Sequence, residues 1–228
     1  LKIGRYFKNK GVDVSFLDCS LPSRFIDTKE NLKSYYKDAP FVRAIKCGNY
    51  NNEGILKLQK YYGMPMDKIK NEIVNSNPTE IWVGTGLTYY WESARDIINV
   101  CKEVLPTVPV LVGGIYPTLF YDHAVKHLKA DYIHKGPLED IDNLYPDYSL
   151  CESKDTTRTF QLGKGCHLKV PCSFCAVETM DPKFIGVQSL PAFNYIKEEY
   201  DKGANFFRIW SSQLLVPPDA FKSLMKRI

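Results

Sequence analysis

The spacing of apolar residues along the chain predicts alternating strands and helices. Residues 80–84, 108–112 and 130–133 are apolar runs without strict alternation, as is typical of strands whose sheet is covered on both faces. Between these runs, residues 91–105 and 121–129 carry apolar side chains at helical spacing. Strands and helices that alternate in this way indicate an α/β fold with a parallel sheet.

The N-terminal part of the chain has a helix pattern, then a strand pattern, then a polar stretch. Residues 1–10 place apolar side chains near one helical face, and Gly11 is a typical helix-ending residue. Residues 12–18 alternate apolar and polar positions, which predicts a strand. From residue 28 to about residue 70 the chain is polar, basic and tyrosine-rich. We interpret residues 28–70 as an insertion in the first domain.

A second run of elements follows a stretch that is typical of a linker. Residues 137–157 are rich in Asp, Pro and Ser. The elements expected beyond it are a strand at 159–162, a helix at 190–201 ended by Gly203, a strand at 205–210 and a final helix that opens near Asp219. We therefore expect a first domain over residues 1–136, a linker over 137–157 and a second domain over 158–228.

Composition narrows the classes of protein. Of the 228 residues 44% are hydrophobic and 25% charged, which excludes a mainly disordered chain. No apolar run reaches about 18 residues and no signal peptide is visible, so we expect no membrane contact and a cytoplasmic location. The net charge of +4 does not by itself imply nucleic acid. The basic, tyrosine-rich insertion leaves nucleic-acid binding as an alternative, and we favour a solvated insertion with a few anchoring aromatic residues.

Three of the seven cysteines lie within ten residues of each other. Residues 165–176 read GCHLKVPCSFCA, so Cys166, Cys172 and Cys175 have the spacing C-x5-C-x2-C on a loop directly after a predicted strand. An odd count with this clustering favours a metal site over a disulfide framework. Three thiolates on one loop can ligate three irons of a cubane cluster, whereas structural zinc requires a fourth ligand. An iron–sulfur loop, a zinc site and coincidence stay open, and the spacing favours the first.

The cysteine loop resembles that of the radical SAM superfamily, in which an aromatic residue, here Phe174, precedes the third cysteine. The order of domains resembles the class with an N-terminal cobalamin (B12)-binding domain, with support from residues 109–118, 130–133 and 206–216. The resemblance implies a flavodoxin/Rossmann-like parallel sheet of B12-binding type. The first βα units of a partial TIM-type radical SAM barrel would follow it.

The same resemblance implies roles for individual residues. Cys166, Cys172 and Cys175 would hold a [4Fe-4S] cluster, and Phe174 would lie near the adenine of S-adenosylmethionine. A one-electron reductant such as flavodoxin or ferredoxin would supply the electron for cleavage, which releases a 5′-deoxyadenosyl radical or a methyl group. Two features depart from the family pattern. The first cysteine pair is two residues further apart than is common, and Ser211 and Ser212 stand where relatives often carry acidic residues.

Cobalamin-binding domains of this type carry short motifs at their strand ends. Residues 85–87, Thr-Gly-Leu, resemble the motif S-x-L, and Gly113 with Gly114 resembles its Gly-Gly motif. The resemblance thus implies cobalamin contacts from Thr85, Leu87, Gly113 and Gly114. Small residues at strand ends also serve tight turns in any α/β protein, so both interpretations remain open. His123 and His127 have helical spacing, for which we favour an ordinary surface helix over a metal site.

We expect a radical SAM enzyme that cleaves S-adenosylmethionine reductively, with or without cobalamin, in a methyl transfer or a radical rearrangement. The alternative is a non-catalytic cobalamin- or nucleotide-binding module with a vestigial or zinc-binding cysteine loop. The substrate, the catalytic residues and the oligomeric state are not readable from the sequence. A barrel of this kind needs roughly 200 residues, and only 70 follow residue 158. We therefore expect a chain truncated at both ends and inactive alone.

Overall fold

The computed structural model describes residues 1–19, 41–50, 56–151, 156–168, 170, 172–212 and 218–228, and side chains only outside 41–50 and 56–62. The chain divides into two compact units. One consists of Leu1–Phe16, Glu80–Ile98 and Pro109–Ile228, and the other of Leu17–Thr79 and Asn99–Val108. Within the described residues, no helix has the length and apolar character needed to cross a membrane.

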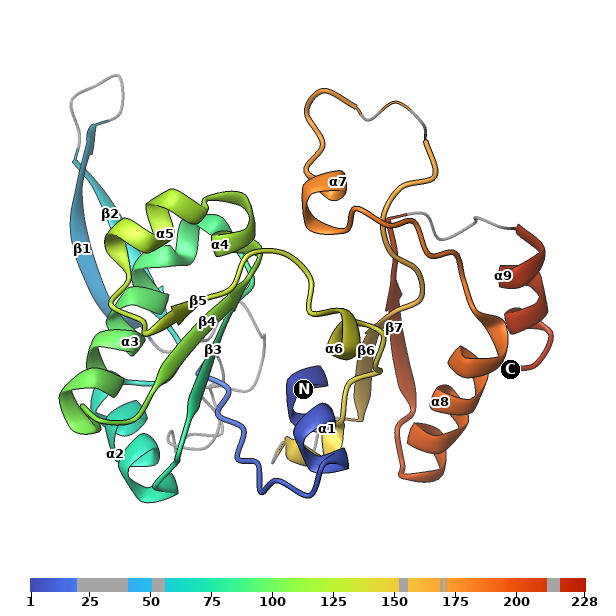
Figure 1. Ribbon diagram of the computed structural model, residues 1–228, viewed down its shortest axis with the longest axis horizontal. Coiled ribbons are helices and arrows are strands. Elements are labelled where there is room, and N and C mark those ends of the chain that lie inside the picture. Colours follow the sequence, from blue (N-terminus) through green and yellow to red (C-terminus); the bar gives the residue numbers. More distant parts are fainter. Residues whose placement is uncertain (20–40, 51–55, 152–155, 169, 171, 213–217) are drawn as a thin grey trace. The chain divides into compact units, whose positions relative to one another are not determined.

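The first unit contains a three-stranded parallel sheet, as the sequence predicts. Its strands are β3 (Ile81–Thr85), β4 (Val110–Gly114) and β5 (Tyr132–Ile133), in the spatial order β3-β4-β5. The connecting elements are η1 (Thr88–Tyr90) and α3 (Trp91–Val104) before β4, and α4 (Ile115–Leu119) and α5 (Tyr121–His127) before β5. These are βα units, so the prediction of a mixed α/β fold with a parallel sheet is confirmed (Figure 1).

One face of this sheet is buried and the other is covered in part. Val110 and Val112 of β4 are 0% and 2% exposed, and Ile98 of α3 is fully buried. On the strand β3, Trp82 receives an edge-on contact from the ring of Phe7 in α1 (Lys2–Asn9), with ring centroids 5.4 Å apart. Coverage from two sides explains why these strands are continuous apolar runs in the sequence.

A second parallel pair in the same unit carries the cysteine loop. The strands are β6 (Thr157–Gln161) and β7 (Phe206–Trp210), which are connected through α7 (Val177–Met180) and α8 (Ser189–Asp201) (Figure 1). Helix α9 (Pro218–Met225) follows. The hydrophobic core of this part contains the buried residues Phe160, Leu162, Val187, Ala192, Tyr195, Ile196 and Leu224.

Helix α8 shows how the sequence sets this packing. Ala192, Tyr195, Ile196 and Glu199 recur at helical spacing, and all four are buried. Gly203 ends the helix with φ +97°, while its N–H and that of the next residue donate to carbonyls of the last turn. The predicted role of Gly203 is therefore confirmed.

The second unit contains a hairpin and a helix that the sequence patterns did not predict, while the interpretation of residues 28–70 as an insertion stays a prediction. The chain there forms an antiparallel hairpin, β1 (Phe41–Tyr50) with β2 (Leu56–Tyr62), followed by helix α2 (Met66–Ser76). Ile69 and Ile73 of α2 are buried, and Lys70 pairs with Glu103 at 2.5 Å. Residues 20–40 and the aromatic side chains of the hairpin lie outside the description, so the choice between a nucleic-acid surface and a solvated insertion stays a prediction.

Two other segments differ from the sequence prediction. Residues 12–18 form no strand, and Val12 and Phe16 are 49% and 38% exposed. Alternating apolar positions are compatible with a strand. A strand also needs an adjacent strand whose backbone accepts and donates its hydrogen bonds, and the pattern does not provide one. The presumed linker contains two short helices, α6 (Glu139–Asp142) and η2 (Tyr148–Leu150). The domain limits 1–136 and 158–228 stay predictions.

Candidate functional site

The cysteine loop starts where β6 ends. Cys166 is partly buried, whereas Cys172 and Cys175 are exposed. The N–H of Cys175 donates to the carbonyl of Cys172 at 3.0 Å, so these two cysteines share one tight turn. Phe174 lies in the same turn and is 90% exposed. Two exposed thiols and an exposed aromatic ring therefore stand together at the tip of the loop.

The base of the loop is a closed neck, formed by residues 163–165 on the outgoing side and residues 181–186 on the returning side. Lys164 and Ile185 pair as an antiparallel bridge, with N–H to O distances of 2.9 and 3.0 Å. Gly165 has φ +68°, and a Cβ there would lie 2.5 Å from the carbonyl oxygen of Lys183. Only glycine fits this conformation and this close approach. Burial raises the pKa of Asp181 on the returning side of the neck.

The three cysteines are not gathered into one ligand set. Among the described residues, no group of three or more His, Cys, Asp or Glu side chains is arranged to hold a metal ion. The structure places Cys172 and Cys175 on one turn and Cys166 next to the neck. The donor chemistry fits an iron–sulfur centre, because cysteine thiolates are the protein ligands of such clusters.

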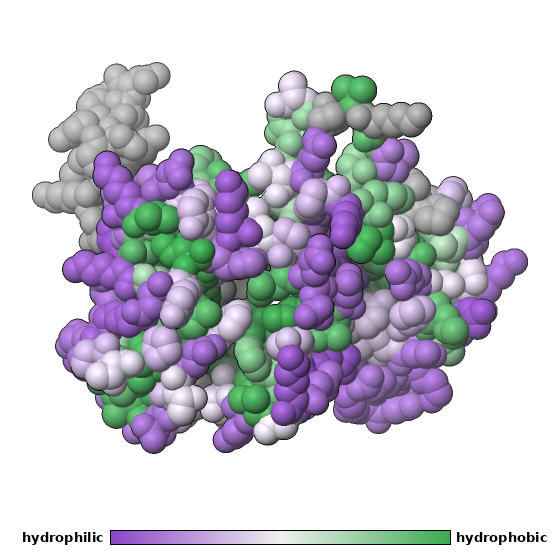
Figure 2. Space-filling model, viewed as in Figure 1, coloured by the Kyte–Doolittle hydropathy of each residue, from purple (hydrophilic) through white to green (hydrophobic). Residues whose placement is uncertain are grey.

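The cysteine loop carries three exposed apolar side chains near the two exposed cysteines in sequence. Leu168, Val170 and Phe174 are 50%, 79% and 90% exposed. Figure 2 shows hydrophobic surface on this loop beside the grey residues. Apolar side chains grouped in this way are typical of surfaces that bind a ligand or another protein segment. The tip of the loop therefore has the character of a binding surface.

The structure also brings together the residues that the cobalamin resemblance singles out. Thr85 ends β3 and pairs in register with Gly114, which ends β4. The hydroxyl of Thr85 donates to the carbonyl of Gly113 at 2.8 Å. A Cβ on Gly114 would lie 2.9 Å from both N and Oγ1 of Thr85, and φ at Gly114 is +106°. Close packing of the two strand ends thus explains Thr85 and Gly114 without any ligand.

Open backbone lies beside this packed contact. A Cβ added at Gly84 or Gly86 would meet no atom within 4 Å, and Leu87 is 44% exposed. Ligands of parallel α/β sheets bind at this end of the strands. The chemistry here fits the approach of a ligand to bare backbone.

Thr118 is a further residue that the motifs did not indicate. Its hydroxyl donates to the carbonyl of Gly114 at 2.7 Å and accepts from the N–H of Gly136 at 3.1 Å. It is 6% exposed and holds the turn after β4. A threonine among apolar neighbours in the first turn after Gly-Gly is the signal that could have identified it.

His123 and His127 belong to an aromatic cluster. Their ring centroids are 4.2 Å apart. The ring centroid of Trp91 lies 4.9 Å from that of His123 and 5.3 Å from that of His127. The Nδ1 atom of His123 is 2.7 Å from the hydroxyl of buried Tyr116. The helix that carries them is α5, and ring contacts account for the position of both imidazoles.

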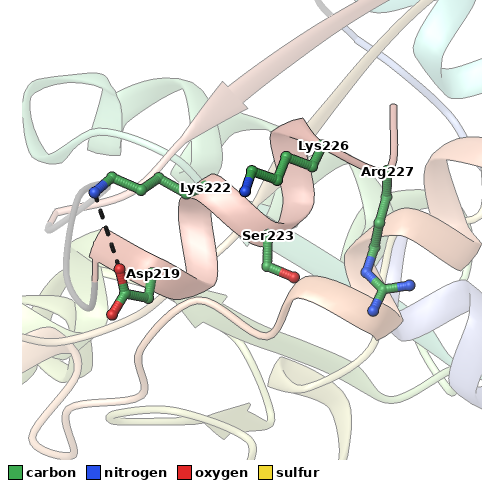
Figure 3. A pocket seen from close by; sticks show the side chains of 5 residues that line it. All are labelled: Asp219, Lys222, Ser223, Lys226 and Arg227. Carbon is green, nitrogen blue, oxygen red and sulfur yellow. Dashed lines mark ion pairs between the residues drawn. The ribbon is translucent and has the colours of Figure 1, made fainter.

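An open pocket of about 380 Å³ lies along α9 and its end (Figure 3). Its lining consists of Asp219, Lys222, Ser223, Lys226 and Arg227. Lys222 pairs with Asp219 at 3.9 Å, and their side chains are 72% and 98% exposed. Well-solvated side chains from a single helix have the character of an ordinary charged surface.

No protein-family model, no curated protein and no solved structure matches the chain. A functional proposal therefore has to rest on the cysteine loop, its neck and the open strand ends.

Proposed function

We propose that the chain carries the cluster-binding part of a radical SAM iron–sulfur enzyme. Cys166, Cys172 and Cys175 would hold a [4Fe-4S] cluster. When bound, that cluster would pass one electron to S-adenosylmethionine and so begin radical chemistry on a substrate. In this proposal β6 and β7 begin a TIM-type barrel, and the β3–β5 sheet is of the B12-binding type.

One observation carries the proposal. The C-x5-C-x2-C loop leaves the carboxyl end of β6, the first strand of a parallel pair that is linked through a helix. Catalytic groups of parallel α/β barrels come from loops at this end of the strands. Three thiols on such a loop, with no second pair of closely spaced cysteines in the sequence, favour an iron–sulfur centre over structural zinc.

The residues around the thiols support the same proposal. The neck holds the backbone just before Cys166, while the shared turn keeps Cys172 and Cys175 close. Leu168, Val170 and Phe174 are apolar and exposed, so they could exclude water from a ligand that settles among them. In this chain the protein contributes position and shielding, and the cofactor contributes the reactive chemistry.

Cobalamin binding is a separate part of the proposal. The open backbone at Gly84 and Gly86, next to Leu87 at the strand ends, supports a ligand on this side of the sheet. Thr85 and Gly114 add little support for cobalamin binding, because the packing of the two strand ends explains both residues. A cobalamin titration followed by absorbance tests this part without reference to the cysteine loop.

The experiment for the main proposal is anaerobic reconstitution with iron and sulfide. We expect about four irons per chain, as a [4Fe-4S] cluster requires, and the broad visible absorbance of an iron–sulfur cluster. Replacement of Cys166, Cys172 or Cys175 by Ala should abolish both. Cys151→Ala is the matched control, because Cys151 lies outside the loop and is partly buried.

The control also distinguishes zinc from iron–sulfur. Structural zinc needs a fourth ligand, and Cys151 is the nearest cysteine in sequence before the loop. Bound zinc that is lost in Cys151→Ala would therefore support the zinc-binding alternative. Cluster absorbance that persists when all three loop cysteines are replaced would overturn the proposal.

A further inference from the structure

Two serines at the end of β7 reach across to the neck of the cysteine loop. The hydroxyl of Ser212 donates to the carbonyl of Gly165 at 2.5 Å, and that of Ser211 donates to the carbonyl of Gly163 at 3.3 Å. Gly165 directly precedes Cys166. We propose that Ser212 is a positioning residue that fixes the orientation of Cys166 within the metal-binding loop. The importance of Ser212 for metal binding rests on the function proposed above.

The need for such a contact follows from the conformation of Gly165. Glycine is the most flexible residue, and here it adopts φ +68°, so the peptide before Cys166 has little intrinsic restraint. The returning side of the neck limits it from one direction, because the carbonyl of Lys183 lies where a side chain would be. Ser212 holds the same peptide through its carbonyl oxygen. Together these contacts set the direction in which the Cα–Cβ bond of Cys166 leaves the backbone.

The three thiols therefore differ in how they are held. Cys172 and Cys175 share a turn at the exposed tip, and the hydrogen bond between their backbones lies within that turn. Cys166 directly follows residues 163–165, which contact both the returning side of the neck and the residues after β7. Cys166 is thus the fixed thiol, and the turn with the other two has to approach it when three ligands close on one centre. Loosening the fixed thiol should weaken the whole set.

The first test measures thiol reactivity in the protein without metal. Each cysteine of wild type and of Ser212→Ala is alkylated at fixed pH under reducing conditions, and the rates are read by mass spectrometry. Loss of one hydrogen bond of about 1 kcal/mol should raise the population of open conformers about fivefold, and the alkylation rate of Cys166 with it. The rates of Cys172 and Cys175 should not change, because both are already exposed.

Two further variants separate positioning from general loosening. Ser212→Thr keeps the hydroxyl and should restore the wild-type rate at Cys166. Ser223→Ala makes the same change on α9, away from the neck in sequence, and should leave all three rates unaltered. Equal Cys166 rates in wild type and Ser212→Ala would overturn the proposal. So would a parallel rise at all three cysteines.

The second test follows the metal. After anaerobic reconstitution, release of iron to a chelator should be about fivefold faster from Ser212→Ala than from wild type, by the same hydrogen-bond energy. Failure of wild type to take up iron would refute the proposed function, while the alkylation rates would still decide the role of Ser212. Uptake of iron with unchanged Cys166 reactivity in Ser212→Ala would refute the positioning role and leave the proposed function standing.

Discussion

Asp147 joins α1 to the turn η2, and its negative charge should stabilise the fold. Its Oδ2 accepts from Nζ of Lys8 at 2.9 Å. Its Oδ1 accepts from the N–H and the hydroxyl of Ser149 at 3.0 and 2.6 Å. Burial by itself would raise the pKa of this carboxyl. The hydrogen bonds from Ser149 and Lys8, with the charge of Lys8, outweigh burial and lower the pKa from 3.8 to about 2.

The size and the pH range of the effect follow from this shift. A carboxyl whose pKa is lower in the folded protein than in the unfolded chain stabilises the fold above the unfolded pKa. A difference of nearly two pKa units corresponds to about 2 kcal/mol at neutral pH. The contribution should shrink to about 1 kcal/mol at pH 3 and vanish as the pH falls through about 2. The side chain of Asp147 is 11% exposed and that of Lys8 is 40% exposed, so solvent screens the lysine side of the pair, and about 2 kcal/mol is an upper value for this contribution.

The perturbation is Asp147→Asn, and the assay is urea denaturation at pH 7, 5, 4 and 3. We expect the variant to be up to about 2 kcal/mol less stable at pH 7, with the difference from wild type narrowing below pH 4. Asp13→Asn, which removes an exposed carboxylate, should show no comparable pH dependence. A constant difference between wild type and Asp147→Asn from pH 7 to pH 3 would refute the reasoning, because the lost contribution would then not be a charge.

Three other changes are expected to alter stability in predictable ways, each measured as the free energy of unfolding in urea. The hydroxyl of Tyr195 is buried without a hydrogen-bond partner among the described residues, so Tyr195→Phe should be neutral or stabilising by up to about 1 kcal/mol; a clear loss would reveal a missing partner. Glu199→Gln should cost about 3 kcal/mol, because Arg158, bonded to Glu199 at 2.7 Å, would keep a buried charge; a cost near zero would contradict this. Gly114→Ala should cost about 3 kcal/mol or more, whereas Gly84→Ala should change stability by less than about 0.5 kcal/mol. Equal effects of the two glycine variants would contradict the packing argument.

The parallel sheet could be predicted because its sequence signals are local. Each of β3 and β4 is a short apolar run, and each is followed by a helix with its own periodicity. Residues 12–18 show a pattern of similar quality and form no strand. Strands β3 and β4 form because each has the other as a neighbouring strand to pair with. Which segments pair, and in which register, depends on the tertiary fold. Periodicity alone does not determine this pairing.

The hairpin of β1 and β2 was missed for a related reason. Residues 28–70 are polar and basic, and their apolar positions show no clear period from which strands could be predicted. Antiparallel strands need only one apolar face, so a polar sequence can still form a ladder when the two strands are adjacent in the chain. The helix α2 was hidden in the same stretch, and only Ile69 and Ile73 of its residues are buried. Two buried positions are too few to stand out in a polar background.

The cysteine loop shows the same limit at the level of function. The proposed iron–sulfur chemistry rests on Cys166, Cys172 and Cys175 alone, because residue type and spacing can be read from one short segment. The neck of the loop could not be predicted in this way, because Gly165 is held by a carbonyl 18 residues later and by a serine 47 residues later. In the sequence, Ser212 attracts attention only because the resemblance leads us to expect an acidic residue at this position. In the fold its hydroxyl donates to the carbonyl of Gly165, in the peptide before Cys166. The cysteine spacing is therefore a local property of the sequence, while the restraint on the peptide before Cys166 depends on contacts that only the folded chain creates.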